Sequence, residues 1–305
     1  MSPRAQASQA SQTPYMDAMS AKIVTALHPA QRDDISDLVT RRPVPGAGLE
    51  QVDPFLFLNH HGPQTYAPGN GGLPFGPHPH RGFETVTFIL EGELAHRDSA
   101  GHESVIRAGG VQWMTAGSGL IHSEVSPEAF KQAGGPLELL QLWINLPGRL
   151  KMSPPRYVGL QADAIPAVPV DQGQATVNLI SGTWGGHTGP IPSLTGVFMT
   201  TIRLTAGGRA GFGSLSGRNI FLYVVSGEVK ANGTVIPAWT LAQFDLDGDM
   251  LEMVAAKDAV VLFGHADPIG EPVFAHGPFV MNTRDEIVDA IRDYNAGLFD
   301  NVSAA

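Results

Sequence analysis

Residues 83–94 read FETVTFILEGEL, a run of β-branched and aromatic residues that ends in a Gly-Glu turn. Such residues are enriched in strands, and glycine suits a tight turn between two strands. Similar short runs recur along the chain, separated by many of its 36 glycines and 24 prolines. They predict strands over residues 84–90, 111–115, 137–146, 196–204, 220–225 and 259–263. The pattern therefore indicates an all-β protein built of sandwiches or barrels.

A second copy of this strand and turn lies further along the chain. Residues 218–229 read RNIFLYVVSGEV, and Gly227 follows Gly92 by 135 positions. The length of 305 residues also exceeds that of a typical single domain. Residues 147–169 are rich in proline and lack strand alternation, which suggests a crossover between two domains. We expect a flexible extension over residues 1–20, a first domain over 21–150 and a second domain over 151–305.

One segment near the C-terminus is expected to form a helix. Thr283 and Glu286 have the spacing of a capping box, in which two side chains bond the free N–H groups of the first turn. Apolar residues recur on one face at positions 287, 291, 294 and 298, and Gly297 is suited to end the helix. We expect the helix to pack against one of the two barrels.

Composition and charge disfavour several classes of partner. The chain has 19 basic and 29 acidic residues, a formal charge of −10 and no cluster of lysine or arginine, so direct binding to nucleic acid is disfavoured. No stretch approaches the roughly 18 uninterrupted apolar residues that a membrane-spanning helix requires. The first twenty residues have no signal-peptide pattern, and cysteine is absent. These features favour a cytoplasmic globular protein, and the acidic surface favours a monomer.

Two pairs of metal-ligating residue types lie on predicted strands. His78 and His80 are two positions apart in PHPHRGFE, and His122 and Glu124 have the same spacing in GSGLIHSE. Residues i and i+2 of a strand project from the same face, so each pair can reach one ion. Two strands that face each other across a barrel would then supply four ligands. Glu84 shares the parity of the first pair, and spacing alone leaves it either a ligand or a residue that orients one.

Three imidazoles and a carboxylate, with no thiolate, suit a divalent transition metal. Fe(II), Mn, Ni, Cu and Zn accept this ligand set, whereas Mg and Ca prefer oxygen ligands. A six-coordinate metal would keep two positions open for a bidentate substrate, or for a substrate and dioxygen. The sequence therefore predicts one metal site in the first domain.

Other residues near the two motifs are expected to have structural roles. Arg81 directly follows His80 and would point away from the metal, as a rim residue with surface hydrogen bonds. Large apolar side chains in a small barrel belong mainly to its core, although they can also wall a pocket for a planar aromatic substrate. The side chains concerned are Phe55, Phe57, Phe83, Trp113 and Met114.

Four stretches of the chain resemble the pirin family of the cupin superfamily. GPHPHRGFETVTFILEGEL (76–94) and GGVQWMTAGSGLIHSEVS (109–126) look like the two signature motifs of that family. The resemblance extends to DPFLFLNHHGP (53–63) and GPFVMNTRDEIVDAIRDYNAG (277–297), and so covers nearly the whole chain from about Lys22 onward. It implies a bicupin of two antiparallel jelly-roll barrels, with one metal, usually iron, in the first barrel.

The resemblance also implies roles for individual residues. Carried over by motif position, the metal ligands are His78, His80, His122 and Glu124. Glu84 then orients a ligand and does not bind the metal itself. The counterparts of His78 and His80 in the second barrel, 135 positions later, are Gly213 and Leu215, which cannot ligate. The second barrel is therefore expected to have no metal, with His187, His265 and His276 as ordinary polar residues.

Asn59 is a departure from the family pattern. Members often have an acidic residue at the position that Asn59 occupies in FLNHHGP, and two histidines follow it here. Asn59 and His61 are therefore candidates for side chains that line the pocket or hold the metal ligands. A loop position near the barrel rim is an equally good expectation for His61.

The resemblance implies two different functions. Bacterial members resemble quercetin 2,3-dioxygenases, which open the heterocyclic ring of a flavonol with dioxygen. On that reading Fe(II) is the first choice of metal, an aromatic enol is the substrate, and Glu124 accepts the proton of the substrate hydroxyl. The alternative is an iron-dependent redox sensor, similar to animal pirin, that binds a transcription factor or a metabolic enzyme without turnover.

Overall fold

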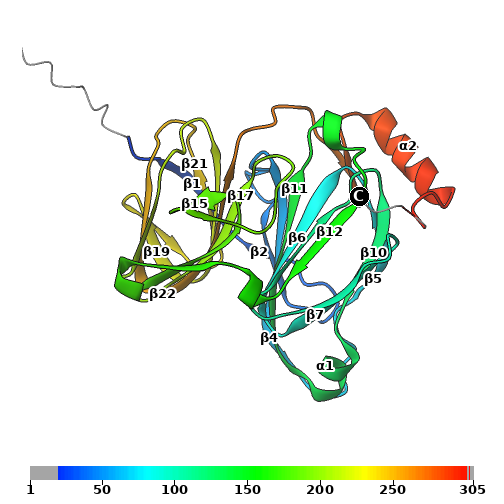
Figure 1. Ribbon diagram of the computed structural model, residues 1–305, viewed down its shortest axis with the longest axis horizontal. Coiled ribbons are helices and arrows are strands. Elements are labelled where there is room, and N and C mark those ends of the chain that lie inside the picture. The colour runs from blue at the N-terminus through cyan, green and yellow to red at the C-terminus, as the bar shows by residue number, and fades with distance from the viewer. Residues whose placement is uncertain (1–19, 301, 303–305) are drawn as a thin grey trace, which may run out of the picture.

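The computed structural model describes residues 20–300 and 302 of the chain. Figure 1 shows two β-rich units side by side, one around β19 and β22 and the other around β5, β6 and β10. The expected extension over residues 1–20 lies, except for Ser20, outside the described residues. Strands dominate both units, so the predicted all-β class is confirmed.

The C-terminal unit contains one antiparallel sheet of nine strands. Its strands are β1 (Val24–Pro29), β13 (Ala167–Val170), β14 (Ala175–Ser181), β17 (Phe198–Leu204), β18 (Arg209–Phe212), β19 (Asn219–Ala231), β20 (Thr234–Pro237), β21 (Thr240–Phe244) and β22 (Leu251–Ala266). The first half of β22 pairs with β18 and its second half with β17. This change of partner lets the sheet fold over its own apolar face, which buries Phe212, Leu222 and Phe263.

The N-terminal unit is a sandwich of two sheets. The larger sheet contains β2 (Gln31–Arg32), β3 (Thr40–Val44), β4 (Phe55–Tyr66), β6 (Phe83–Glu91), β9 (Val111–Thr115), β11 (Gly135–Asn145) and β12 (Arg156–Leu160). The smaller sheet contains β5 (Phe75–His80), β7 (Glu93–Asp98), β8 (Glu103–Arg107) and β10 (Leu120–Val125). In it, β5 forms an edge and β10 lies between β5 and β7.

Short elements complete the described fold. They are the helices α1 (Glu128–Ala133) and α2 (Arg284–Asn295), the 3-10 turns at Gly148–Leu150, Ala162–Ala164 and Asp171–Gly173, and the strands β15 (Thr183–Trp184), β16 (His187–Thr188), β23 (Phe274–His276) and β24 (Phe279–Met281). The helix predicted near the C-terminus is α2. Its capping box is present, with Thr283 accepting from the Glu286 N–H and the Glu286 carboxylate accepting from the Thr283 N–H.

A shared apolar layer holds the two units together. The outer face of the larger N-terminal sheet, with Val86 and Leu142, packs against Met199, Phe221 and Leu262 of the C-terminal unit. The inner face of the same sheet covers the smaller sheet. Each strand of the larger sheet therefore alternates between side chains that face the second unit and side chains that face the interior of the first.

The chain crosses between the units more than once. β1 pairs with β21 of the C-terminal sheet, and β12 pairs with β9 of the N-terminal sheet. The proline-rich segment 147–169, where the sequence predicts no strand alternation, contains the short strand β12 and the start of β13. Both are edge strands, where proline is tolerated because one side of the strand needs no hydrogen bonds. The domain boundaries expected at 20/21 and 150/151 stay a prediction.

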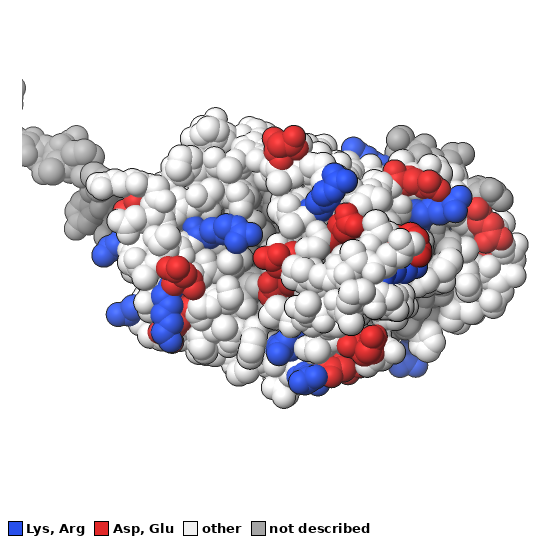
Figure 2. Space-filling model, turned by 90° about the horizontal axis from the view of Figure 1, so that it is seen from below, with Lys and Arg blue, Asp and Glu red and all other residues white. Residues whose placement is uncertain are grey.

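The surface shows no strongly basic face in the view of Figure 2. Blue and red side chains are interspersed there over both units. Among the described helices none combines the length and the apolar character needed to cross a membrane.

The two glycines of the internal repeat have the same backbone conformation. Gly92 has φ +82° and Gly227 has φ +77°, a region that other residues adopt only with strain. A Cβ atom would lie 2.7 Å from the Pro136 carbonyl oxygen at the first position and 2.1 Å from the Asp258 carbonyl oxygen at the second. The two glycines therefore occupy matched backbone positions. The predicted turn between two strands is wrong, however, because Gly227 lies at a bulge within β19 and Gly92 joins β6 to β7, which belong to different sheets.

We expect Gly227→Ala to destabilise the protein by roughly 3 kcal/mol or more, because backbone strain and a clash with the backbone act together. Gly233→Ala is the control, since Gly233, in the turn between β19 and β20, has φ +95° but no atom within 4 Å of the added Cβ. It should cost only about 1 kcal/mol. Urea unfolding measures both, and equal losses would contradict a role for the close contact.

Candidate metal centre

Three histidines converge on the edge of the smaller N-terminal sheet. His78 and His80 lie on β5, His122 lies on β10, and the pairing of these strands places His122 opposite His78. One ring nitrogen from each histidine lies within 4.8 Å of the other two. The expectation of two strands facing each other across a barrel is wrong, because β5 and β10 are hydrogen-bonded neighbours. Their side chains meet on one face of a single sheet.

Backbone carbonyls fix the tautomers of two of these rings. The Nδ1 of His78 lies 2.8 Å from the Gly76 carbonyl oxygen, and the Nδ1 of His80 lies 3.2 Å from that of Pro278. A carbonyl only accepts, so each Nδ1 carries a proton, and in the neutral ring the lone pair is then on Nε2. A bulge in the pairing of β5 with β10 gives β5 one extra residue, at Gly76 or Pro77. The bulge thus lies next to the carbonyl that accepts from His78.

Two of the three histidines, His80 and His122, are held in the neutral form that binds metals. Burial lowers the pKa of His80 to about 3, and the neighbouring His78 adds to the effect. Burial likewise lowers the pKa of His122 well below its ordinary value. The Nε2 atoms of His78 and His122 are 3.0 Å apart. Convergent lone pairs on neutral rings are what a divalent transition metal requires, so the residues fit such an ion.

Glu124 lies in the interior of the sandwich, but it is not among the side chains whose ligand atoms converge within 4.8 Å. It is buried, two positions after His122 on β10. Its carboxylate accepts hydrogen bonds from Thr87 Oγ1 at 2.9 Å and from the side-chain amides of Gln112 and Gln141. These three donors come from β6, β9 and β11 of the opposite sheet, and they compensate the cost of burying a carboxylate.

Glu84 lies on the other face of the larger sheet and is not brought to the histidines. It pairs in register with Thr115, whose hydroxyl donates to it at 2.6 Å. On β6, the Glu84 side chain points to the same face as Val86, which belongs to the apolar layer between the units. The Thr87 side chain points to the opposite face, toward Glu124. Gly82 lies between β5 and β6 with φ +89°, so strand parity does not carry over from His80 to Glu84. Burial raises the pKa of Glu84 to about 7.

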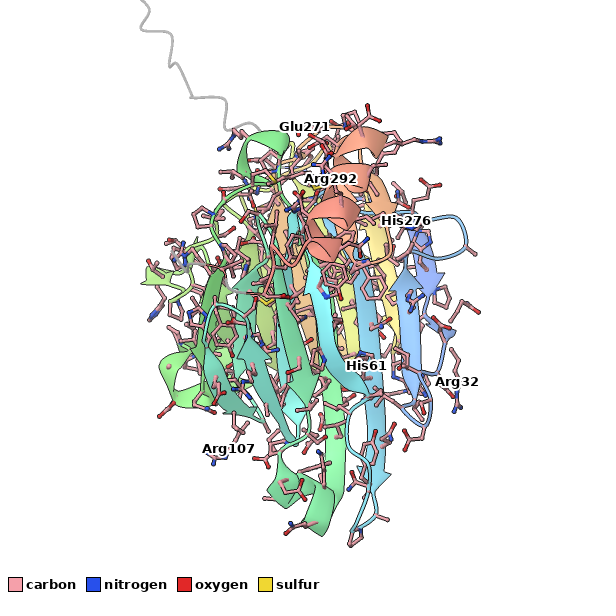
Figure 3. All side chains as sticks on the ribbon, turned by 90° about the vertical axis from the view of Figure 1, so that its right-hand side faces the viewer. Arg32, His61, Arg107, Glu271, His276 and Arg292 are labelled. Carbon is pink, nitrogen blue, oxygen red and sulfur yellow. The ribbon has the colours of Figure 1, made fainter. Side chains whose placement is uncertain are left out.

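Asn59 and His61 lie on β4 and are both buried. Their side chains project from the same face of the larger sheet as that of Gln141. Asn59 pairs in register with Gln141, and its side-chain oxygen accepts from Arg42 Nε at 3.0 Å. The Nδ1 of His61 is hydrogen-bonded to Thr40 Oγ1 at 2.9 Å, and its Nε2 has no partner among the described residues. Figure 3 shows His61 in the middle of the strands, away from the loops. The expectation of a loop position at the rim is therefore wrong.

The sequence reasoning missed the side chains that hold Glu124. Gln112 and Gln141 are amides flanked on both sides by apolar residues, and that contrast is the signal that was available. Trp143 was also missed, although it is two positions from Gln141 and shares the inner face of β11 with it. Its ring centre lies 5.4 Å from that of His80 and 4.7 Å from that of Phe57.

The aromatic residues divide between the two faces of the larger sheet. Phe57 and Phe83 gather around Trp143 on the side of the histidines. Phe55 and Trp113 belong to the apolar layer between the units. Phe55 and Trp113 are therefore core residues, as expected, whereas Phe57 and Phe83 lie on the side of the three histidines.

A further histidine lies close to the centre without joining it. His96 on β7 is buried and pairs in register with Glu124, and its ring centre is 5.5 Å from that of His122. Its Nε2 is 3.0 Å from Asp98 Oδ2, and its ring stacks on Tyr157 at 4.1 Å. Nothing in the sequence around His96 marks this placement, which depends on the pairing of β7 with β10.

Arg81 is buried, which contradicts the expectation of a rim residue. Its guanidinium donates to Asp293 at 2.9 Å and to the Ser118 carbonyl oxygen at 2.7 Å, and it lies over the Phe299 ring. The side chain does point away from the histidines. The C-terminal segment covers that side, however, and removes Arg81 from solvent.

The second unit has no equivalent centre among the described residues. Leu215 is fully buried in the apolar core at the position that corresponds to His80. His265 accepts a hydrogen bond from Arg218 at 2.6 Å and stacks on Phe198. His187 and His276 are exposed. The histidine group on β5 and β10 is the one cluster of possible metal ligands found within residues 20–300 and 302.

Comparisons with known proteins agree with this architecture. Residues 37–144 match the family model described as Pirin, and residues 199–300 match the Pirin C-terminal cupin domain. A pirin-like protein of Caulobacter vibrioides is 42% identical over 252 residues, which cover 82% of this chain and 88% of that protein. Rat pirin is 35% identical over 285 residues, covering 91% and 93% of the two chains.

A solved structure of similar shape supports the same assignment. The crystal structure of quercetin 2,3-dioxygenase from Acinetobacter baumannii superposes with a TM-score of 0.86 at 31% identity. The match covers 92% of this chain and 99% of that one. Together with the two family models, it confirms the predicted bicupin fold.

The neutral state of His61 predicts how stability depends on pH. Burial lowers its pKa from 6.5 to about 3, with His60 and Arg42 contributing. Between these values the unfolded chain binds a proton that the folded chain does not, so stability falls as pH falls, by up to about 1.4 kcal/mol per pH unit. We expect His61→Gln to reduce the slope of this loss between about pH 6.5 and pH 4 in urea unfolding, while the other buried histidines, His80 and His122, keep their contributions. The exposed His187→Gln should keep the wild-type slope, and an unchanged slope in His61→Gln would contradict the prediction.

Proposed function

Since the chain belongs to the pirin family, we propose that it is a metal-dependent dioxygenase of the quercetin 2,3-dioxygenase type. Its substrate would be a flavonol or a similar aromatic enol, and its second substrate dioxygen. One observation carries the proposal: three imidazoles converge on one face of the smaller sheet, and the next inward side chain of β10 is a carboxylate whose hydrogen-bond donors are all neutral. The name of the Acinetobacter baumannii protein, which has the same fold, also supports it.

We propose His78, His80, His122 and Glu124 as the metal ligands. The Nε2 atoms of the histidines are the natural donors, since backbone carbonyls occupy the Nδ1 atoms of His78 and His80. Fe(II) is our first choice of metal, and Mn, Ni, Cu and Zn are alternatives that the same ligand set accepts. A cytoplasmic location and a monomeric state stay predictions of the sequence.

The hydrogen bonds of Glu124 specify which oxygen is available. Oε1 accepts from both Thr87 and Gln112, which uses its two lone pairs. Oε2 accepts from Gln141 and keeps one lone pair. Glu124 would therefore ligate through Oε2 alone. The same lone pair, when released, would accept the proton of the substrate hydroxyl, which makes Glu124 the candidate catalytic base.

The surroundings of the histidines suit a flat aromatic substrate. A bound metal of this class supplies Lewis acidity and a place where an electron-rich substrate and dioxygen can meet. Phe57, Phe83 and Trp143 form an apolar wall next to His80, which favours a planar ring and excludes water. His78 is only partly buried at the edge strand β5, so small molecules would approach the histidines from this edge.

We expect Glu124→Gln to weaken metal binding by more than about 100-fold, because the variant loses the only anionic ligand. Glu84→Gln is the matched control, since Glu84 is equally buried but hydrogen-bonded to Thr115 on the other face of the sheet. It should keep the wild-type affinity. Isothermal titration with Zn(II) measures both variants. Retained affinity in Glu124→Gln, with loss in Glu84→Gln, would reverse the assignment of the carboxylate ligand.

Turnover of a flavonol tests the reaction itself. We expect the protein loaded with Fe(II), Mn(II), Ni(II) or Cu(II) to bleach the visible absorbance of quercetin under oxygen with at least one of these metals. His122→Ala should lose both metal and turnover with little cost to folding, whereas the exposed His187→Ala should keep both. Absence of turnover with every metal, in protein that holds one ion per chain, would reject the dioxygenase and favour the redox-sensing regulator.

A further inference from the structure

The C-terminal segment leaves the second unit and packs on the metal-binding unit. Figure 1 shows the chain passing over both units from the C-terminal sheet to α2, which lies against the outside of the first unit. We call residues 277–299 the C-terminal strap. It contains β24 and α2 and ends at the buried Phe299. In Figure 3, α2 lies in front of the strands, and Arg292 is labelled on this helix.

The strap supplies the hydrogen-bond acceptor of one histidine in the metal centre. The Nδ1 of His80 donates to the carbonyl oxygen of Pro278 at 3.2 Å, across 198 positions of sequence. The acceptor for His78, by contrast, is Gly76, two positions away on the same strand. Two rings of one site are thus oriented by different parts of the molecule.

Backbone contacts and a buried lysine fix the strap close to His80. The Val280 N–H donates to the Arg81 carbonyl oxygen at 3.0 Å, so the strap runs alongside the end of β5. The Lys151 ammonium donates to the carbonyl oxygens of Gly82 at 2.9 Å and Val280 at 3.0 Å. Its third bond is to Asn145 at 2.7 Å, which satisfies all three of its donors in a buried place.

Side chains further along the strap anchor the residue that follows His80. The Arg81 guanidinium is paired with Asp293 of α2 at 2.9 Å. The same guanidinium lies over the ring of Phe299 at 4.7 Å, and that ring packs so closely on Gly119 that no Cβ would fit there. Arg81 is therefore held both by an ion pair with Asp293 and by contact with the Phe299 ring.

Orientation of a ligand histidine through its second nitrogen has a large effect on metal affinity. Removing such an outer hydrogen bond typically weakens metal binding by about 10- to 100-fold. A free imidazole exchanges its proton between Nδ1 and Nε2, and only an acceptor at Nδ1 keeps Nε2 unprotonated for the metal. For His80 that acceptor is present only while the strap is docked.

We propose that the C-terminal strap positions His80 for metal binding, through the Pro278 carbonyl, and so couples metal affinity to the docking of the strap. The inference rests on His80 being a ligand in the proposed function, but not on turnover. A strap that serves only to stabilise the fold would affect His78 and His80 alike. A positioning strap affects His80 and spares His78.

The test compares two neighbouring apolar residues of the strap in the full-length protein. Phe299→Ala removes the buried anchor, and Leu298→Ala is the control, since Leu298 is 61% exposed. Ring nitrogen shifts of ¹⁵N-labelled histidine, measured on the metal-free protein, report the tautomer of each ring. Competition with a chelator for Zn(II) reports the metal affinity.

We expect Phe299→Ala to leave His78 in its Nδ1–H tautomer while His80 becomes a mixture of tautomers. The Zn(II) affinity should fall by about 10-fold in this variant and stay unchanged in Leu298→Ala. Asp293→Asn should act in the same direction as Phe299→Ala. Its control is Asp289→Asn, because the Asp289 carboxylate pairs only with Arg292 on the exposed side of α2.

Amide hydrogen exchange at residues 279–281 shows whether the strap has been released. If neither single variant releases it, the double variant Phe299→Ala/Asp293→Asn is measured in the same way. Release of the strap with an unchanged His80 tautomer and Zn(II) affinity would overturn the proposal, and so would equal changes at His78 and His80. If the wild-type protein bound no Zn(II), the proposed ligand set would fail, while the tautomer comparison would still report on the strap.

Discussion

The buried carboxylate of Glu124 is the constraint on which the metal-binding unit depends. A carboxylate between two sheets is stable only where donors meet it, and three donors reach it from the opposite sheet. Thr87, Gln112 and Gln141 thereby tie β10 to the larger sheet. His122 is two positions from Glu124 on the same strand, so this tie also fixes the place of the histidines.

The two faces of the larger sheet of the first unit line two different interiors. One face has amides and aromatic rings directed at the metal centre, and the other has aliphatic side chains directed at the second unit. Glu84 and Thr87 are close in sequence but lie on different faces for this reason. The second unit, whose own core is filled by residues such as Leu215, contributes by covering the apolar face.

The two units are also joined because a segment from each end of the chain packs on the unit at the other end. The early strand β1 completes the C-terminal sheet, and the late segment around α2 covers the N-terminal unit. Neither unit therefore consists of one continuous stretch of chain. A residue near the C-terminus, Pro278, contacts a histidine of the metal centre, and a residue near the N-terminus, Lys22, donates to three carbonyls of the second unit.

The sequence by itself determined the all-β class, the capped helix and the spacing that directs His78 and His80 to one face, because these depend on local periodicity and turn chemistry. It left Glu84 and Glu124 as competing candidates, since parity along a strand does not say which sheet or face the strand occupies. Only the tertiary structure decided that β5 and β10 are neighbours, and that Gln141 meets Glu124. Those pairings depend on contacts between distant segments, which no local pattern encodes.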